Sequence, residues 1–171
     1  ALFHSSSGGM TENSQDVWKN KYPYLSSVKD FDKNNPKFRW QKKISSNELI
    51  NLFPKIGGLK NIEILDISST GRVKNVKLIG GYGSDQMSGV VLRKRLSLNS
   101  NFVRFKFFEE ESNNNFPIKK GLIVFGQGSG HGVGMSQWGA KYLASRGQKA
   151  ERILKYFYRG VQIKPFRKDY L

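Results

Sequence analysis

The chain has 171 residues, 37% of them hydrophobic and 13% aromatic, and its 29 Lys and Arg against 13 Asp and Glu give a formal net charge of +16. This length and composition can bury a core, which argues against disorder and favours one domain over residues 1–171. The lack of cysteine excludes disulfides and thiolate zinc sites, and no apolar run approaches the roughly 20 residues that span a bilayer.

The positive charge favours a polyanionic partner. Nucleic acid, an anionic membrane and the carboxylate- and phosphate-rich wall of a bacterium all meet that description. The basic residues are scattered over every segment rather than gathered on one stripe, so simple solubility is an equally open interpretation.

The first 25 residues combine a polar, Gly-bearing turn (SSSGG) with TENSQDVW and KYPYL. This pattern predicts loop and short helix, with Trp18 and Tyr24 as aromatic anchors to the core. The opening ALFHSSSGG has no basic-then-apolar leader and is typical of the middle of a strand and turn, so we expect the chain to be part of a longer protein.

A capping box formed by Ser45 and Glu48 predicts a short helix that ends before Pro54. Ser88 is placed to cap a second short helix, with Leu92 and Leu96 inward and residues 93–95 exposed. Runs of β-branched and aromatic residues predict strands over 61–67, 72–80, 102–108 and 121–126.

Within 102–108 the apolar residues alternate with Arg104 and Lys106, as expected for a strand in a sheet that has one solvent-exposed face. The stretch EEESNNN at 109–115 predicts an exposed loop.

The C-terminal part is helical in pattern. One helix has Met135, Trp138 and Tyr142 on one face and ends at Gly147. The next carries apolar residues at 153, 154 and 157 and ends at Gly160. The predicted fold class is therefore α+β: a mostly antiparallel β-sheet with short helices and a C-terminal helical hairpin.

Glycines occupy positions 126, 128, 130, 132 and 134, between a predicted strand and a predicted helix. Glycine lets a ligand or another chain segment approach the backbone closely, and a helix start offers unpaired N–H groups. This segment has no Walker lysine and no acidic ribose partner in a parallel βαβ unit, and the chain has only two histidines, so nucleotide and zinc sites are poorly supported.

Two interpretations remain open for His131, which either fixes the loop by bonding to its backbone or contacts a ligand. Trp138 is expected in the core. Tyr22, Tyr24 and Trp40 are candidates to stack on sugar rings, although anchoring roles are more usual for such residues.

Three ordered segments carry a family resemblance: FHSSSGGMTENSQDVW, SGVVLRKRLSLNSNF, and HGVGMSQWGA followed by LASRGQKAERILKYFYRGVQI. Together they resemble the SpoIID/LytB domains, and the resemblance spans essentially the whole chain. It implies lytic-transglycosylase-like activity on peptidoglycan glycan strands, preferentially strands stripped of stem peptides by an amidase, or enhancement of such an amidase.

The resemblance also implies a division of roles. The catalytic Glu of the family lies in a helix upstream of the residues present here, so no catalytic residue is expected in this chain, and a structural role is favoured for Glu12. Glycan binding is expected from two groups of residues: Ser5, Ser6, Ser7, Gly8, Gly9, Thr11 and Glu12, and Gly130, His131, Gly132, Gly134, Met135, Ser136 and Gln137.

No metal and no cofactor are expected, because the cysteines that some relatives use for a metal are missing. The implied partners are peptidoglycan glycan strands, an N-acetylmuramoyl-L-alanine amidase and the upstream part of the same domain. The implied location is extracytoplasmic, at the cell wall or membrane of a bacterium. Two alternatives remain. One is a non-catalytic wall-binding or amidase-enhancing module, and the other is a basic nucleic-acid-binding domain, for which the sequence contains no recognisable motif.

Overall fold

The fold is that of a computed structural model, which describes residues 1–18, 20–110 and 119–164. In chain order the elements are β1 (Phe3–His4), α1 (Ser14–Val17), η1 (Pro23–Leu25), β2 (Arg39–Ile44), α2 (Ser46–Leu52), η2 (Pro54–Ile56), β3 (Asn61–Ile67), β4 (Val73–Ile79), β5 (Ser84–Ser88), α3 (Gly89–Arg95), β6 (Val103–Glu110), β7 (Lys119–Gln127), β8 (Met135–Ser136), α4 (Gln137–Ser145) and α5 (Ala150–Phe157). The predicted α+β class is confirmed.

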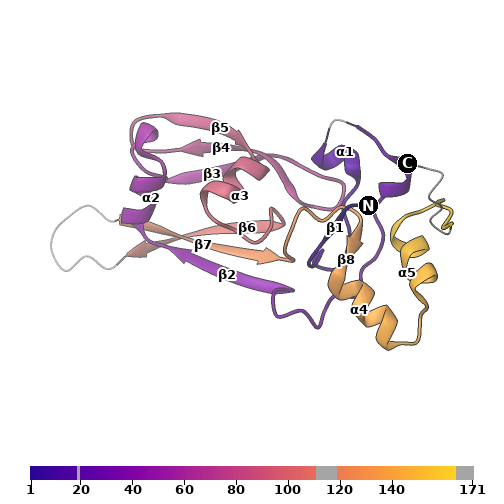
Figure 1. The fold of residues 1–171 in the computed structure, drawn as a ribbon. Coiled ribbons are helices and arrows are strands. Elements are labelled where there is room, and N and C mark those ends of the chain that lie inside the picture. The colour runs from indigo at the N-terminus through magenta and orange to yellow at the C-terminus, as the bar shows by residue number, and fades with distance from the viewer. Residues whose placement is uncertain (19, 111–118, 165–171) are drawn as a thin grey trace.

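The strands form two antiparallel three-stranded sheets, in the orders β2-β7-β6 and β3-β4-β5. A third, two-stranded pairing joins β1 and β8 in parallel. Figure 1 shows the two larger sheets with α2 and α3 at one end of the molecule, and α1, α4 and α5 around the short β1–β8 pair at the other. The mostly antiparallel pairing and the C-terminal helix pair are as predicted, but the strands form two larger sheets rather than one, and Met135 belongs to β8 because it pairs with Phe3, so that α4 begins only at Gln137.

Buried apolar side chains form two separate clusters. The first gathers residues of both larger sheets and of α2 and α3, including Leu49, Leu78 and Leu122. The second combines Leu25 and Val28 with Val133 and residues of α5. No pattern in the sequence indicates this division, and the expectation of one domain over 1–171 stays a prediction.

The predicted local elements match the structure closely. Ser45 caps α2 in a complete capping box with Glu48, and Ser88 caps α3. All four predicted strands are present as β3, β4, β6 and β7. In β6 the charged Arg104 is exposed, as the alternation requires, while Val103 is buried.

Several placements differ from the predictions. Glu109 and Glu110 belong to β6 rather than to a loop, and Glu110 accepts hydrogen bonds from the backbone N–H and hydroxyl of Ser46. The rest of that predicted loop, 111–115, lies outside the described residues. Arg93 is half-buried because its Nε donates to the Leu98 carbonyl oxygen.

The aromatic anchors differ too. Trp18 and Tyr24 are at the surface, 36% and 37% exposed, because Leu25 and Val28 fill the second cluster in their place. Trp138 was expected in the core but is half-buried, with the Lys141 ammonium 4.8 Å from its ring centroid.

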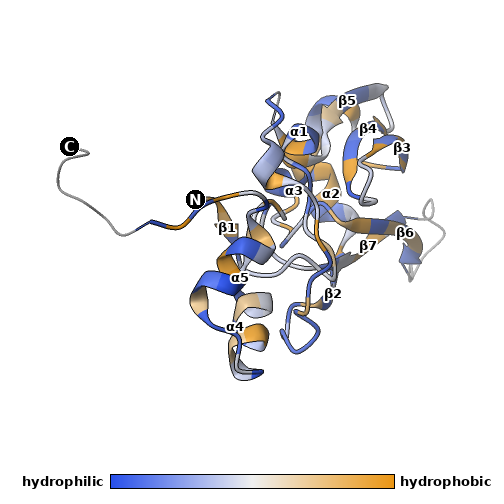
Figure 2. Cartoon of the chain, turned by 90° about the vertical axis from the view of Figure 1, so that its right-hand side faces the viewer, coloured by the Kyte–Doolittle hydropathy of each residue, from blue (hydrophilic) through white to orange (hydrophobic). Residues whose placement is uncertain are grey.

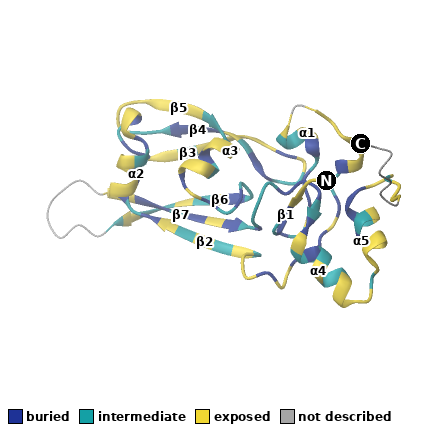
Figure 3. Ribbon diagram, viewed as in Figure 1, coloured by how far each residue is buried: buried dark blue, intermediate teal, exposed yellow. Residues whose placement is uncertain are grey.

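Exposure is uneven over the larger sheets. Figure 3 shows β3 mostly exposed, whereas β4 and β7 have buried stretches. Among the helices of the described residues, none is long and apolar enough to cross a membrane.

Candidate functional site

The two predicted halves of the site meet in the structure. The parallel β1–β8 pair sets Phe3 opposite Met135 and His4 opposite Ser136. Single bridges then join Ser6 to Ser129 and Glu12 to Val133. The Ser-rich turn and the Gly-rich turn, more than 120 residues apart in sequence, therefore lie against each other.

The alternating glycines are required by this contact. The four glycines at 128, 130, 132 and 134 all have positive φ, a backbone conformation that other residues adopt only at an energetic cost. An added Cβ would also collide with the N-terminal segment or with Arg72: Gly128 with the Ser6 carbonyl, Gly130 with the Cβ of His4, Gly132 with the Arg72 guanidinium and Gly134 with the Leu2 carbonyl. The close approach that the glycines predict is thus made by the chain itself.

Two carboxylates lie beneath the Ser-rich turn and hold it. Asp32 accepts from the Ser6 hydroxyl at 2.5 Å and from the Gly8 N–H at 2.8 Å. Asp30 accepts from the Ser7 hydroxyl at 2.5 Å. Burial, with a smaller contribution from Asp32, raises the pKa of Asp30 above its usual value. The hydroxyls of Ser6 and Ser7 therefore point inward to these carboxylates.

Arg72 joins the β3–β4 hairpin to the Ser-rich turn. Its side chain is 2% exposed, and its Nη2 donates to the carbonyl oxygens of Ser7 (2.6 Å) and Met10 (2.9 Å). Its Nη1 donates to the Thr70 hydroxyl at 2.6 Å and lies 3.7 Å from a carboxylate oxygen of Glu12. This buried guanidinium links the two ends of the molecule.

Glu12 is fully engaged by neighbouring groups. It is 1% exposed and accepts from the Thr70 hydroxyl at 2.7 Å and from the Asn13 N–H at 2.9 Å, in addition to the ion pair with Arg72. Both carboxylate oxygens are therefore occupied within the fold, which agrees with the structural role favoured from the sequence.

The two histidines lie side by side, with ring centroids 5.6 Å apart. Burial lowers the pKa of His4 to about 4, and in the neutral ring Nδ1 donates to the Val133 carbonyl oxygen at 3.1 Å. Burial also lowers the pKa of His131, whose Nδ1 accepts from the Val133 N–H at 3.1 Å. Both rings are therefore neutral at neutral pH, and the loop-fixing bond expected as one interpretation of His131 is present.

Part of the junction remains open to solvent. The half-buried His131 ring packs against the partly exposed Trp18 ring, with centroids 5.4 Å apart. Phe3 is 58% exposed, Ser5 is half-buried and Gln137 is exposed. We call these five residues the turn surface. It combines two apolar rings with polar groups, which suits a ligand that has both apolar and hydrogen-bonding faces.

Comparisons with known proteins bear on what this arrangement is for. Residues 24–134 match a family described as a domain of unknown function, DUF8618. Stage II sporulation protein D of Bacillus subtilis is 34% identical over 165 residues, covering 95% of this chain and 44% of that protein. The protein of the same name from Bacillus amyloliquefaciens is 33% identical, again covering 95% and 44%.

The chain belongs to the DUF8618 family and is SpoIID-like. It also matches a protein named amidase enhancer from Bacillus subtilis, at 27% identity over 210 residues that cover 95% of this chain and 29% of that protein. The chain thus spans less than half the length of these curated relatives.

The expected binding residues of this SpoIID-like chain fall into two groups in the structure. Solvent reaches Ser5, Gly9, Gly130, His131, Met135 and Gln137 at least in part. The others are buried: Ser6, Ser7, Gly8, Thr11, Glu12, Gly132, Gly134 and Ser136. Their assignment to glycan binding stays a prediction, and the partly exposed group is the better placed to contact a ligand directly.

The sequence did not single out three residues that hold the site together, namely Asp30, Asp32 and Arg72. The KDFDK stretch offered a weak signal, because two acids flank an aromatic residue just after the apolar Val28. For Arg72 no local pattern marks the site, since Ser7, Met10 and Glu12, the partners that tie it to the Ser-rich turn, are all distant in sequence. Among the described residues, no group of three or more His, Asp or Glu side chains is placed to hold a metal ion.

Proposed function

We propose that this chain binds cell-wall glycan strands at the turn surface, as part of a longer extracytoplasmic SpoIID-like protein. The observation that carries the proposal is the partly exposed Trp18 ring packed against His131, at the point where the Ser-rich and Gly-rich turns meet. The names of the relatives support a sporulation and cell-wall setting.

The chemistry of the turn surface fits a neutral amino sugar. A sugar ring has an apolar face that packs on an aromatic ring and a rim of hydroxyl and acetamido groups that need partners. Trp18 supplies the aromatic face, while Ser5 and Gln137 supply donors and acceptors. The lowered pKa of His131 keeps its ring neutral, so it contributes packing rather than charge.

We also propose that the full-length protein cleaves the strand as a lytic transglycosylase. One carboxylic acid protonates the leaving glycosidic oxygen, and its conjugate base then takes the proton of the 6-hydroxyl as that oxygen attacks the anomeric carbon. Glu12 is unsuited to this task because both its oxygens are held inside the fold. We propose that the acid comes from sequence outside these 171 residues, as the family resemblance implies.

Binding is tested with the 171-residue chain and peptide-free glycan strands. Replacing Trp18→Ala removes the aromatic face, and we expect at least a tenfold loss of affinity, which corresponds to about 1.4 kcal/mol. Tyr82→Ala is the matched control, because Tyr82 is an 87% exposed aromatic residue next to β5, at the other end of the molecule. Equal affinity of the two variants would exclude the turn surface as the glycan site.

Cleavage is tested with the full-length protein on the same strands. The proposal predicts products with 1,6-anhydro ends, and their absence under conditions where strands bind would remove the transglycosylase function.

A second candidate function, stimulation of an amidase, is motivated by the relative named amidase enhancer. In that case the chain would raise the rate of an N-acetylmuramoyl-L-alanine amidase on intact peptidoglycan while producing no 1,6-anhydro ends.

A further inference from the structure

A groove between α4 and α5 lies apart from the turn surface. It consists of two adjoining cavities of about 480 and 200 Å³ that share Gln148 and Arg152. The larger cavity is lined by Gly147, Gln148, Lys149, Glu151, Arg152 and Lys155. We call the two together the α4–α5 groove.

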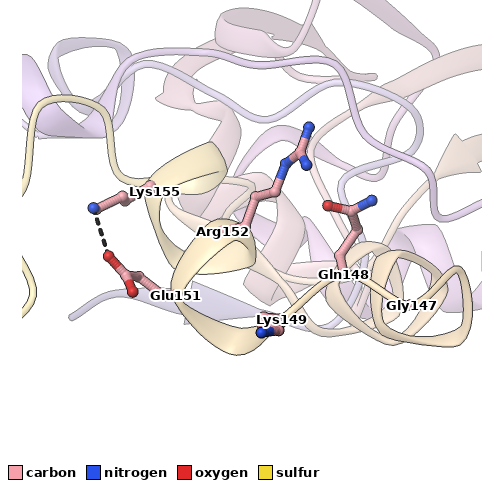
Figure 4. Close-up of a pocket in the computed structure, with 6 residues that line it drawn as sticks. All are labelled: Gly147, Gln148, Lys149, Glu151, Arg152 and Lys155. Atoms are coloured by element: carbon pink, nitrogen blue, oxygen red, sulfur yellow. Dashed lines mark hydrogen bonds and ion pairs between the residues drawn. The ribbon is translucent and has the colours of Figure 1, made fainter.

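One end of the groove is positively charged. Lys155 is paired with Glu151 at 2.6 Å, so their charges offset each other, as Figure 4 shows. Lys149 and Arg152 also line this end, and neither forms an ion pair with any residue that the structure describes. The groove therefore carries two uncompensated positive charges, and Figure 2 shows hydrophilic stretches on α5.

The other end of the groove is apolar and fixed in place. It is lined by Phe31, Leu143, Ile153 and Tyr156. The rings of Phe31 and Tyr156 lie 5.9 Å apart, and the Tyr156 hydroxyl donates to the Lys29 carbonyl oxygen at 2.6 Å. Because this hydrogen bond orients the ring, the apolar end has a defined shape.

We propose that the α4–α5 groove binds an acidic sugar unit of a glycan polymer. The carboxylate pairs with the Arg152 guanidinium, which lines both cavities, while Lys149 adds positive charge to the larger one, and the sugar ring packs against the apolar end. A combined cavity of this size accommodates a small ligand, and cationic groups beside an apolar wall match a carboxylate attached to a ring. The identity of the polymer rests on the proposed function, but the site is separate from the turn surface.

The test compares two variants that lose the same charge. Lys149→Gln/Arg152→Gln removes the two cations of the groove. Lys94→Gln/Arg104→Gln removes one Lys and one Arg from exposed positions on α3 and β6. Each is titrated with peptide-free glycan strands bearing free muramic carboxylates, with the same strands after methyl esterification, and with a single-stranded oligonucleotide of similar length. Thermal melting confirms that both variants are folded.

We expect the groove variant to bind the acidic strand about tenfold more weakly than the control variant, and both to bind the esterified strand equally. Equal weakening by both variants would show that only the overall charge matters and would overturn the proposal. A selective loss of oligonucleotide binding alone would overturn it in favour of nucleic acid.

The same titration separates this inference from the proposed function. If Trp18→Ala weakens binding while the groove variant behaves like its control, the turn surface stands and the groove fails. If only the groove variant weakens binding, the groove stands and the turn surface fails.

Discussion

Gly132 shows how one residue type can be dictated by a contact. Its φ of +84° is strained for other residues, and an added Cβ would lie 2.9 Å from the Nε of Arg72. The guanidinium has little freedom to move aside, because its two Nη atoms are held by three hydrogen bonds.

We therefore predict that Gly132→Ala lowers the free energy of unfolding by about 3 kcal/mol. Gly147→Ala is the control, because Gly147 has a similar φ of +81° but open space around it, and backbone strain alone should cost about 1 kcal/mol. Chemical denaturation of both variants measures the difference. Equal losses of unfolding free energy would mean that the contact with Arg72 does not contribute to the cost of the Gly132→Ala substitution.

Arg72 neutralises a buried carboxylate, so its removal should be costly. We predict that Arg72→Met lowers the free energy of unfolding by about 3–5 kcal/mol, because Glu12 is left charged and buried. Adding Glu12→Gln removes that charge and should restore part of the loss. A double variant no more stable than Arg72→Met would contradict the ion-pair account.

His4 makes the stability depend on pH. Its folded pKa of about 4 lies below the ordinary value of 6.5, so between these values the unfolded chain binds more protons. Stability should therefore rise with pH across this window and be lost on acidification, by at most about 3 kcal/mol.

The variant His4→Asn should be less stable at pH 7 but should show a flatter dependence between pH 6.5 and 4. The shifted pKa values of Asp30 and His131 also contribute to the pH dependence, but both groups are present in both proteins, so the difference between the two profiles reports His4. Parallel pH profiles of unfolding free energy would show that His4 titrates normally.

At the scale of elements, α2 is held by a cap that acts locally. Ser45→Ala removes the acceptor for the Glu48 N–H and should cost about 1 kcal/mol. Ser84→Ala, at an exposed position in β5, should change the free energy of unfolding by less than about 0.5 kcal/mol. Thermal or urea unfolding distinguishes the two, and a neutral Ser45→Ala would argue against the capping box.

Elements whose sequence patterns involve only neighbouring residues were predictable from the sequence. The capping box of α2, the alternation in β6 and the glycines at 147 and 160 each depend on neighbouring residues only. β2 and β5 were missed because RWQKKI and SDQMS are too polar to indicate strands, and each is held by pairing with a more apolar neighbour, β7 or β4.

The candidate site was predictable in part. The two motifs marked where it lies. Their contact depends on the parallel β1–β8 pair, which closes a loop of about 130 residues, and no local sequence pattern indicates that pairing. The expected anchors Trp18 and Tyr24 lie at the surface because smaller apolar residues nearby fill the cluster, which a pattern of residue types does not reveal.

At the scale of the molecule, two apolar clusters are joined by polar contacts at the site itself. Arg72 reaches from the sheet end into the Ser-rich turn, and the Trp40 indole of β2 donates to the Gly128 carbonyl oxygen at 2.8 Å. The turn surface, where we propose that glycan binds, thus lies where the two ends of the molecule meet, and contacts across this junction hold its shape.

The most direct test of the glycan-binding account is an NMR titration of the isotope-labelled chain with a short peptide-free glycan. The account predicts concentration-dependent shifts of the Trp18 indole N–H and of the Ser5, His131 and Gln137 amides, with the amide of Tyr82 unchanged. Shifts that leave Trp18 and His131 unmoved while saturating elsewhere would contradict it.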